Sequence, residues 1–315
     1  KLFLLDAFAL IYRAYFAFGK NQRYNSKGLN TSAMLGFTNT LIEVLEKQKP
    51  THIAVVFDAP GGATNREEVF TDYKAGREAM PEDLKTSIPY IKRIIEAFNI
   101  PMYLLEGYEA DDIIGTMAKE AERQGFETYM MTPDKDFGQL VSENIFMYKP
   151  AAYGKPAQKM GIPEVCEKFG VENPLQVIDI LGLWGDAVDN IPGIPGIGEK
   201  TSKILIAKYG SVEGLIAHAH ELKGKQKENV INFAEQGLLS KMLATIILDV
   251  PVAYDLADTI LESPDEEKIT ELFAELEFRN LAKRILGREI QIKPVAVPAQ
   301  PGGQMDLFGN VMKTV

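Results

Sequence analysis

The chain has 315 residues, 46% of them hydrophobic, which predicts one large or two modest globular domains with a well-buried core. A single cysteine, Cys166, excludes an intramolecular disulfide framework and a thiolate metal cluster and favours a reducing, cytoplasmic compartment. The apolar runs fall short of the ~20 residues of a membrane helix, and residues 1–6 are too short for a signal peptide, so we expect no membrane partner.

The formal net charge of −10 argues against a nucleic-acid partner, because phosphate backbones usually select a basic protein. Bound divalent cations would reverse the local field around clustered acids. A nucleic-acid function therefore requires that many of the acids gather around metal ions.

The first half of the sequence alternates short apolar strands with longer helices. The strands are predicted at 1–5, 52–57, 101–105, 127–132 and 144–148, and the helices at 7–18, 30–47, 84–98 and 109–125. Asn30 or Thr31 can cap the second helix. This alternation predicts an α/β fold with a mostly parallel central sheet and helices on both faces. Residues 64–83 have mixed charge and no apolar period, which predicts a mobile excursion.

From about residue 162 the pattern is helical only. Helices are predicted at 163–169, 174–184, 199–209, 212–218, 238–248, 265–277 and 279–286. After Gly287 the sequence is rich in Pro, Gly and Gln, which predicts a flexible tail. The organisation expected is an α/β region at 1–160, a helical region at 161–287 and a tail or linker at 288–315.

Carboxylates recur where the predicted strands end and where the neighbouring helices begin. The set is Asp6, Asp58, Glu109, Asp111, Asp112, Asp134, Asp136, Asp186 and Asp189. In a parallel sheet the carboxyl ends of the strands lie along one edge, and ligands bind in the crevice outside them. We therefore expect these side chains to be neighbours, with Asp186 and Asp189 folding back over the edge from the helical half.

Lys135 is the only basic residue in the segments that carry these nine acids, so the acids would repel one another unless cations held them. Oxygen ligands, with histidine scarce, suit Mg²⁺ or Mn²⁺ rather than Zn²⁺. The number of acids indicates two ions at ~3.5–4 Å, an arrangement that flanks a phosphodiester during attack by water. Any one of these acids can instead be a helix cap or a turn residue.

The segment 185–201, GDAVDNIPGIPGIGEKT, joins two of the acids to a glycine-rich turn that leads into a helix. Backbone N–H groups at such a turn and helix start can bind a phosphate. The candidate phosphate contacts are Gly193, Gly196, Gly198, Lys200 and Lys203. Contacts to a phosphate backbone predict binding without sequence preference. An ordinary packing joint between two helices is the alternative.

Basic and aromatic residues also follow Asp58, namely Arg66, Tyr73, Lys74 and Arg77. Beside an acidic metal site they can attract a phosphate strand and stack a base, although a solvated helix of mixed charge has the same pattern. Arg13 belongs to a similar set near the N-terminus, whose aromatic members can equally belong to the core.

Six ordered blocks carry a resemblance to a known family: LLDAFALIYRAYFA, AVVFDAPG, YKAGR, GYEADDIIGT, TPDKDFGQL and GLWGDAVDNIPGIPGIGEKTSKIL. From Leu2 to about Gly287 the chain resembles the 5′ nuclease domain of bacterial DNA polymerase I, within the flap endonuclease superfamily. The resemblance implies a PIN-like nuclease core with a helical arch at about 64–83. It also implies a helix-hairpin-helix element at 186–209 that grips duplex DNA.

The same resemblance implies Mg²⁺-dependent hydrolysis at 5′ flaps, nicks and RNA–DNA primer junctions during replication and repair. All nine acids match the metal-ligand positions of the family, and Lys74 and Arg77 match the arch residues that steer the scissile phosphate. Gly193 to Lys203, with Thr201 among them, match the hairpin, which in related proteins also holds K⁺ through backbone carbonyls. The expected location is the bacterial cytoplasm, in association with the nucleoid.

The tail segment QMDLF (304–308) resembles the short peptide by which bacterial replication proteins bind the sliding clamp. Gln304, Leu307 and Phe308 would be its contacts, and a linker into a polymerase module is the alternative. Two other functions remain open for the chain as a whole. One is a non-catalytic DNA-binding module, and the other is a Mg²⁺-dependent phosphohydrolase of small phosphate esters.

Overall fold

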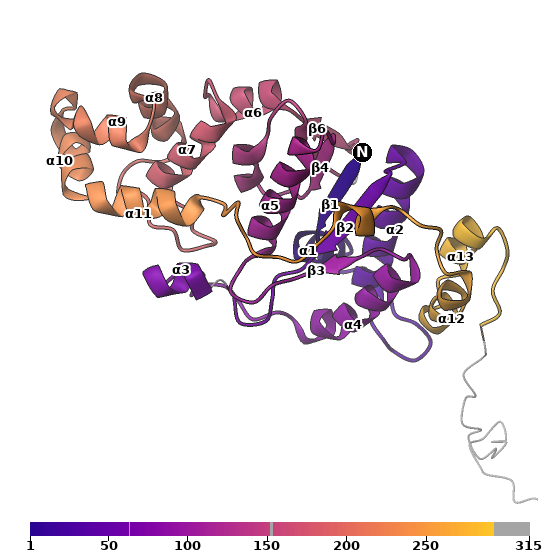
Figure 1. The fold of residues 1–315 in the computed structure, drawn as a ribbon. Coiled ribbons are helices and arrows are strands. Elements are labelled where there is room, and N and C mark those ends of the chain that lie inside the picture. The colour runs from indigo at the N-terminus through magenta and orange to yellow at the C-terminus, as the bar shows by residue number, and fades with distance from the viewer. Residues whose placement is uncertain (63, 152–153, 293–315) are drawn as a thin grey trace, which may run out of the picture.

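A computed structural model describes residues 1–62, 64–151 and 154–292. An α/β region carries the central sheet, and a helical region extends from one side of it (Figure 1). No helix within these described residues is both long and apolar enough to cross a bilayer. Residues 293–315, with the candidate clamp contacts Gln304, Leu307 and Phe308, lie outside the described part of the chain.

The sheet has six strands in the order β3-β2-β1-β4-β5-β6. Their bounds are β1 Leu2–Asp6, β2 His52–Val56, β3 Met102–Tyr103, β4 Thr128–Met131, β5 Ile145–Lys149 and β6 Gln158–Met160. The first five are parallel, and β6 is antiparallel to β5. The predicted, mostly parallel sheet is therefore confirmed. The sequence did not indicate β6, because Gln158 and Lys159 are exposed polar residues without an apolar alternation.

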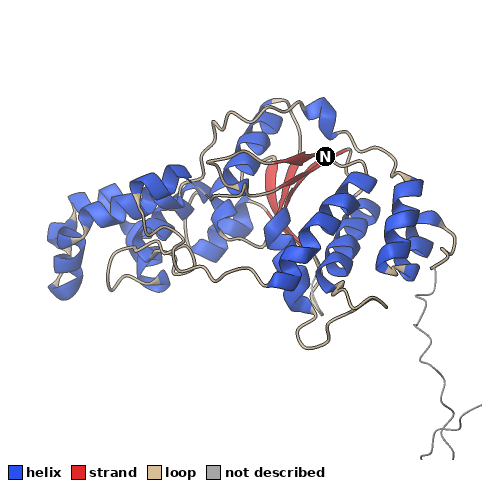
Figure 2. Cartoon of the chain, turned by 90° about the horizontal axis from the view of Figure 1, so that it is seen from below, coloured by secondary structure: helices blue, strands red, loops and turns tan. Residues whose placement is uncertain are grey.

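Helices cover both faces of the sheet, as predicted (Figure 2). One face packs on α1 (Ala7–Ala17), α2 (Ser32–Gln48) and α4 (Glu82–Ala97), and the other packs on α5 (Ala110–Arg123). Alternate residues of β1 point to the two faces. Phe3 and Leu5 pack in the core with α1, α2 and α4, and Leu2 and Leu4 pack in the core with α5. Asn30 accepts a hydrogen bond from the Ser32 amide at 3.0 Å, and so it helps to start α2.

The excursion at 64–83 is mostly not helical. Only α3 (Thr64–Val69) forms a helix of its own, and turns follow it up to Gly76. Lys74 has φ +57°, a left-handed backbone value that a continuing helix cannot contain. The helical arch expected over this whole range is therefore wrong in its extent, since no apolar stripe exists there to bury a longer helix.

The helical region contains six α-helices within the described residues. Their bounds are α6 Ile162–Phe169, α7 Val177–Trp184, α8 Glu199–Tyr209, α9 Val212–Ala217, α10 Gly224–Asn232 and α11 Ala234–Ala244. Four 3₁₀ segments complete the middle of the chain: η1 Asp136–Leu140, η2 Pro174–Gln176, η3 Ala219–Glu221 and η4 Leu256–Thr259. The sequence missed α10, whose residues are mainly polar, and placed α11 four residues too late.

The last two helices, α12 (Glu266–Leu276) and α13 (Arg279–Leu286), return to the α/β region. Their apolar residues belong to the core cluster of α1, α2 and α4, and the Asp265 amide donates to the carbonyl of Ala97 at 2.8 Å. The last two helices of the predicted helical region 161–287 therefore pack on the α/β region. Helical periodicity identifies a helix but not the surface on which it packs.

Candidate active site

The strand-end acids converge on one edge of the sheet, because β1 pairs with both β2 and β4. Asp6, the last residue of β1, is 6% exposed and accepts hydrogen bonds from the Ala9 amide at 3.1 Å and the Thr132 hydroxyl at 3.0 Å. Asp58 follows β2 and accepts a hydrogen bond from the Ala110 amide at 2.9 Å. Asp134 follows β4. The topology thus brings three segments of the predicted set together.

Four of these acids lie close enough to repel one another, and we call them the strand-end group: Asp6, Asp58, Asp111 and Asp134. Burial, together with the charges of Asp58 and Asp134, raises the pKa of Asp6 to about 7. Burial also raises the pKa of Asp111 well above its usual value, again with repulsion from Asp134 and Asp6. Ionisation of this group is therefore unfavourable, and a bound cation would reduce the repulsion among its carboxylates.

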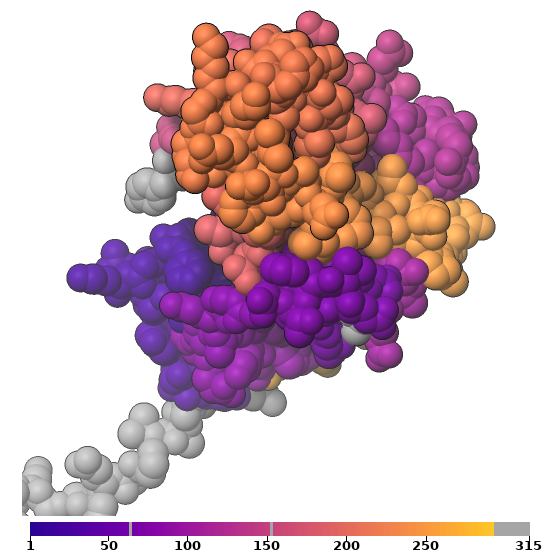
Figure 3. Space-filling view, turned by 90° about the vertical axis from the view of Figure 1, so that its left-hand side faces the viewer, coloured from indigo at the N-terminus to yellow at the C-terminus, as the bar shows by residue number. Residues whose placement is uncertain are grey.

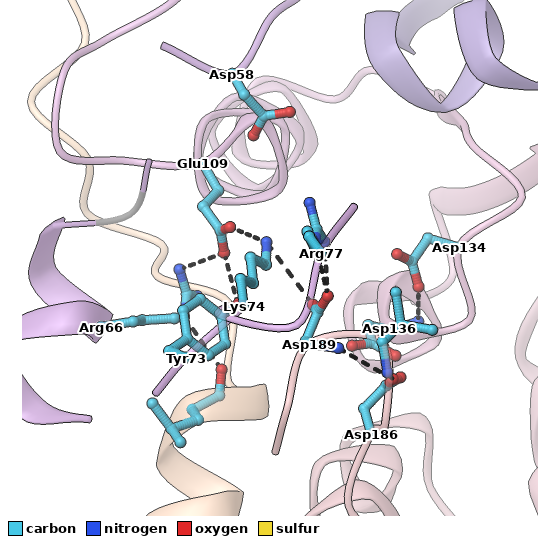
Figure 4. Close-up of polar contacts among 12 residues, drawn as sticks. Asp58, Arg66, Tyr73, Lys74, Arg77, Glu109, Asp134, Asp136, Asp186 and Asp189 are labelled. Carbon is cyan, nitrogen blue, oxygen red and sulfur yellow. Dashed lines mark hydrogen bonds and ion pairs between the residues drawn. The ribbon is translucent and has the colours of Figure 1, made fainter. Parts of the chain in front are cut away.

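Lysine and arginine side chains contact a second set of acids. We call these acids the hairpin group: Glu109, Asp136, Asp186 and Asp189. Lys74 contacts Glu109 and lies 3.7 Å from Asp189, while Arg77 donates to Asp189 at 2.6 Å (Figure 4). The Lys74 amide also donates to the carbonyl of Asp189 at 2.9 Å. The segment after α3 is thus fastened to the hairpin that precedes α8.

Lys135 serves the remaining two members of the hairpin group. Its ammonium donates to Asp186 and lies 3.6 Å from Oδ1 of Asp136. Burial acts to raise the pKa of Asp186, but the hydrogen bond and the charge of Lys135 outweigh it, so this pKa lies below its usual value. The pKa of Asp136 is raised to about 7 by burial and by the neighbouring Asp134.

Asp112 does not join either group. Arg66 donates to both of its carboxylate oxygens at 2.7 and 2.8 Å, and the Ile247 amide donates to it at 2.8 Å. Asp112 is fully buried, and Arg66, 7% exposed, also donates to Glu109 at 2.9 Å. In this arrangement Asp112 and Arg66 form a buried ion pair, so neither the metal-ligand prediction for Asp112 nor the DNA prediction for Arg66 agrees with the contacts.

Two other predicted DNA contacts also face protein. Tyr73 is 4% exposed and its hydroxyl donates to Glu109 at 3.0 Å. The guanidinium of Arg13 contacts the carbonyls of Pro150, at 3.3 Å, and Ala151. Both side chains therefore hold elements of the crevice in place in this structure. A sequence pattern of basic and aromatic residues does not distinguish this role from contact with DNA.

Part of the glycine-rich turn is available at the surface. Gly193 is buried, and its amide donates to the Ser240 hydroxyl at 2.9 Å, so the prediction that it offers this amide to a phosphate is wrong for this structure. Gly196, with φ +79°, Gly198 and Lys200 are exposed at the start of α8, and Thr201 is half-buried. Lys203 is partly engaged, since it donates to Glu199 at 2.8 Å.

Segments far apart in the sequence build the rim of this site. Arg66 donates to the carbonyls of Leu243 and Thr245, at 3.1 and 2.9 Å, and so connects α3 to the chain that leaves α11. Figure 3 shows the purple segment that contains α3 directly against the orange helical region. The crevice acids and the hairpin are therefore held in one packed assembly.

The donors of the crevice fit a hard divalent cation. All are carboxylate oxygens, which such cations prefer, and Oδ1 of Asp136 is buried with no hydrogen-bond donor in the described part of the chain. As the side chains stand, no three acids, histidines or cysteines of the described residues form a group that could hold an ion. Lys74, Arg77 and Lys135 contact the hairpin group instead, and they would have to move before a metal ion could bind to that group.

Two residues near the acids were missed as site residues. Thr132 donates to Asp6, and Lys135 pairs with Asp186 across 51 residues. The position of Lys135 between Asp134 and Asp136 was the available signal. Its role was not readable, because nothing in the local sequence says that the side chain turns toward the hairpin.

The fold and the acidic edge agree with two matches to family models. Residues 1–170 match the model described as 5′-3′ exonuclease, N-terminal resolvase-like domain, and residues 172–267 match the model described as 5′-3′ exonuclease, C-terminal SAM fold. The chain therefore belongs to the 5′-3′ exonuclease family.

Curated relatives include DNA polymerase I of Bacillus caldotenax, 42% identical over 294 residues, which covers 90% of this chain and 32% of the relative. DNA polymerase I of Geobacillus stearothermophilus is 43% identical over 299 residues, with 94% and 34% covered. The chain thus spans about a third of the length of these relatives. The predicted resemblance to the 5′ nuclease domain of bacterial DNA polymerase I is confirmed.

Solved structures share the fold at low sequence identity. The bacteriophage T5 D15 flap endonuclease, in a complex with DNA and metal ions, has a TM-score of 0.63 at 20% identity, and 91% of this chain and 98% of that chain are covered. The catalytic core of Rad2 in a complex with DNA substrate has a TM-score of 0.60 at 16% identity, with 91% of each chain covered.

Proposed function

We propose that this chain is a structure-specific 5′ nuclease that hydrolyses phosphodiesters at 5′ flaps, nicks and RNA–DNA primer junctions. One observation carries the proposal: acids from separate strands and from the hairpin gather in one crevice beside an exposed glycine turn. Family membership and the DNA complexes of the structural neighbours support it. An acidic protein can accept DNA here because metal ions would reverse the field of the crevice.

Two divalent ions, Mg²⁺ in the cell and Mn²⁺ as a substitute, are the proposed cofactors. The strand-end group would hold one ion, and the hairpin group, which includes Glu109, would hold the other. When bound, such ions supply an activated water and neutralise charge that develops on the phosphate. The divalent zinc ions bound to T5 5′-exonuclease and the metal ions in the T5 D15 complex support a divalent ion, and the all-oxygen donor set of this crevice favours Mg²⁺.

Lys74 and Arg77 are the proposed catalytic helpers. In this structure both contact acids, Lys74 with Glu109 and Arg77 with Asp189. Once cations neutralise those carboxylates, the same two side chains would be free to bind the scissile phosphate and orient it toward the crevice. Asp6 and Asp58 would stay fixed throughout, since backbone amides and Thr132 already hold them.

The glycine turn is the proposed DNA grip. Gly196 and Gly198 would approach a phosphate through their backbones, and Lys200 and Thr201 would add side-chain donors at the start of α8. A K⁺ ion held by carbonyls of the same turn belongs to this proposal. Because such contacts reach the sugar–phosphate backbone, binding should follow the shape of the DNA rather than its sequence.

Three further proposals rest on the relatives and the sequence. The relatives are about three times as long as this chain, which supports a polymerase module in the same protein, and their bacterial origin supports a location at the nucleoid. The segment at Gln304, Leu307 and Phe308 remains a candidate for binding the sliding clamp, and it lies outside the described residues.

The test replaces Asp134 with Ala and measures cleavage of a 5′-flap duplex in Mg²⁺, with mapping of the cut. We expect the rate to fall roughly a thousandfold, because several kcal/mol of charge stabilisation are lost, while DNA affinity in Ca²⁺ is retained. The control Asp258→Ala removes an exposed acid outside the crevice and should cleave normally. Undiminished cleavage by Asp134→Ala would contradict the proposal.

The same assays separate the two other functions. Binding of the flap duplex without Mg²⁺-dependent turnover by the unaltered protein would point to a non-catalytic DNA-binding module. Faster turnover of a generic phosphate ester than of the flap duplex would point to a phosphohydrolase of small esters.

A further inference from the structure

Lys135 lies between the candidate metal ligands Asp134 and Asp136 in the sequence, and its ammonium lies beside Asp136 and Asp186 in space. Its ammonium donates to Oδ2 of Asp186 and lies 3.6 Å from Oδ1 of Asp136. That oxygen of Asp136 is buried and has no hydrogen-bond donor within the described residues. The ammonium therefore supplies the positive charge at a point where the crevice needs a cation.

The backbone of Lys135 is fixed, whereas its side chain is free to leave. Lys135 precedes η1, whose Phe137 and Leu140 are buried, so the turn that carries it is anchored in the core. The side chain is 30% exposed, and its ammonium lies 5.6 Å from the centre of the Trp184 ring. Movement of the ammonium into solvent would therefore cost two contacts with acids and the contact with the Trp184 ring, and it would leave the buried side chains of η1 in place.

Lys135 differs in this respect from the other cations of the site. Lys74 and Arg77 come from the segment after α3, far from the hairpin acids in sequence. Lys135 is covalently adjacent to Asp134 and Asp136 and stays beside the crevice whatever that segment does. It therefore competes with an incoming ion in every state of the protein.

We propose that Lys135 is an internal counter-cation that sets the affinity of Asp136 and Asp186 for a divalent ion. The inference rests on the proposed function, since it takes these acids as ligands. An ammonium and a divalent ion bound to the same carboxylates repel each other and compete for the same oxygens. The ion binds there only after the ammonium is displaced, so its apparent affinity is reduced. The strand-end group, which makes no ion pair within the described residues, binds its ion first.

The test measures Mn²⁺ binding to the whole protein by electron paramagnetic resonance of the free ion. The variants are Lys135→Met, which keeps the length and removes the charge, and Lys135→Arg, which keeps the charge. We expect two classes of site in the unaltered protein, and the weaker class should tighten about tenfold in Lys135→Met. Lys135→Arg should stay within about twofold of the unaltered protein.

Lys119→Met is the matched control. Lys119 is 28% exposed and also pairs with one acid, Glu122 at 3.3 Å, but on α5 outside the crevice. The substitution Lys119→Met removes one positive charge from the protein and should leave the affinity of both classes of Mn²⁺ site unchanged. Equal tightening in Lys119→Met would mean that net charge alone acts, and this would overturn the proposal.

The remaining outcomes separate this inference from the proposed function. Two classes of site with no tightening in Lys135→Met would overturn the role of Lys135 and leave the metal crevice standing. No Mn²⁺ binding by the unaltered protein would overturn both.

A second measurement uses the unaltered protein and does not depend on the folding of a variant. Nuclear magnetic resonance of isotope-labelled lysine side chains can follow the ammonium of Lys135, whose signal is assigned by its loss in Lys135→Arg. As Mg²⁺ fills the weaker class, this signal should shift and its protons should exchange faster with water. A signal that stays in place at saturating Mg²⁺ would contradict displacement.

Discussion

The two sides of the crevice carry similar numbers of acids but differ in their partners. Asp6 and Asp111 of the strand-end group face other acids, and burial and repulsion raise their pKa values. Asp186 of the hairpin group faces Lys135 instead, and its pKa is lowered. Among the described residues, the acids of one side therefore lack paired cations, while Glu109, Asp186 and Asp189 on the other side are paired with cations of the protein itself.

This difference indicates how such a crevice can stay folded without metal. A site in which every acid repelled its neighbours would cost much of the small free energy of unfolding of a protein. Internal ion pairs on the hairpin side limit that cost. They also fasten the segment around Lys74 and Arg77 over the crevice until cations take their place.

The largest expected effect comes from Asp111 and Asp112, two adjacent acids with opposite surroundings. Asp111→Asn should lower flap cleavage roughly a thousandfold, since it removes a ligand of the strand-end group. In metal-chelating buffer it should also raise the free energy of unfolding, because it removes a charge that Asp134 and Asp6 repel. Rates and denaturant unfolding of the purified variant measure both.

Asp112→Asn is the matched control for that experiment, and we expect the opposite effects on stability and on cleavage. It should lower the free energy of unfolding, because the buried Arg66 would lose one of its two charged partners and keep only Glu109. Its folded molecules should still cleave the flap. A loss of cleavage as large as that of Asp111→Asn would show that Asp112 is a ligand after all.

Arg66 gives the second prediction, on stability alone. Arg66→Ala should lower the free energy of unfolding by about 3–5 kcal/mol, because the buried Asp112 loses its cation and Glu109 loses one of its two cations. Arg77→Ala breaks a pair that is half-exposed on the arginine side and should cost less than about 1 kcal/mol. Equal losses in the two variants would contradict the division into buried and exchangeable ion pairs.

The fold was largely readable from the sequence, and the partners of the acids were not. Strands that end in Asp6, Asp58 and Asp134 predicted the shared edge because parallel strands must align their carboxyl ends. The pairing of Arg66 with Asp112 spans 46 residues, and that of Lys135 with Asp186 spans 51. Such contacts depend on how α3 and the hairpin pack, which no local pattern encodes.

The smallest expected effect is on DNA affinity and concerns Lys200, at the start of α8 after the glycine turn. Lys200→Ala should weaken binding of any duplex by a few fold and reduce the slope of log affinity against log salt by about 1, since it removes one exposed phosphate contact. Fluorescence anisotropy at several salt concentrations measures this. Lys225→Ala, an exposed lysine on α10 that pairs with Glu228, provides the comparison. An unchanged slope in Lys200→Ala would remove Lys200 from the proposed grip.

The central claim is that the strand-end group and the hairpin group differ in their affinity for a divalent ion. Its most direct test is anomalous X-ray scattering from crystals equilibrated with increasing concentrations of Mn²⁺. We expect the first ion to lie among Asp6, Asp111 and Asp134 at low concentration. A second ion should lie beside Asp136 and Asp186 only at higher concentration, with the ammonium of Lys135 displaced. A first ion on the hairpin side, or both ions filling together with Lys135 still on Asp186, would contradict the account.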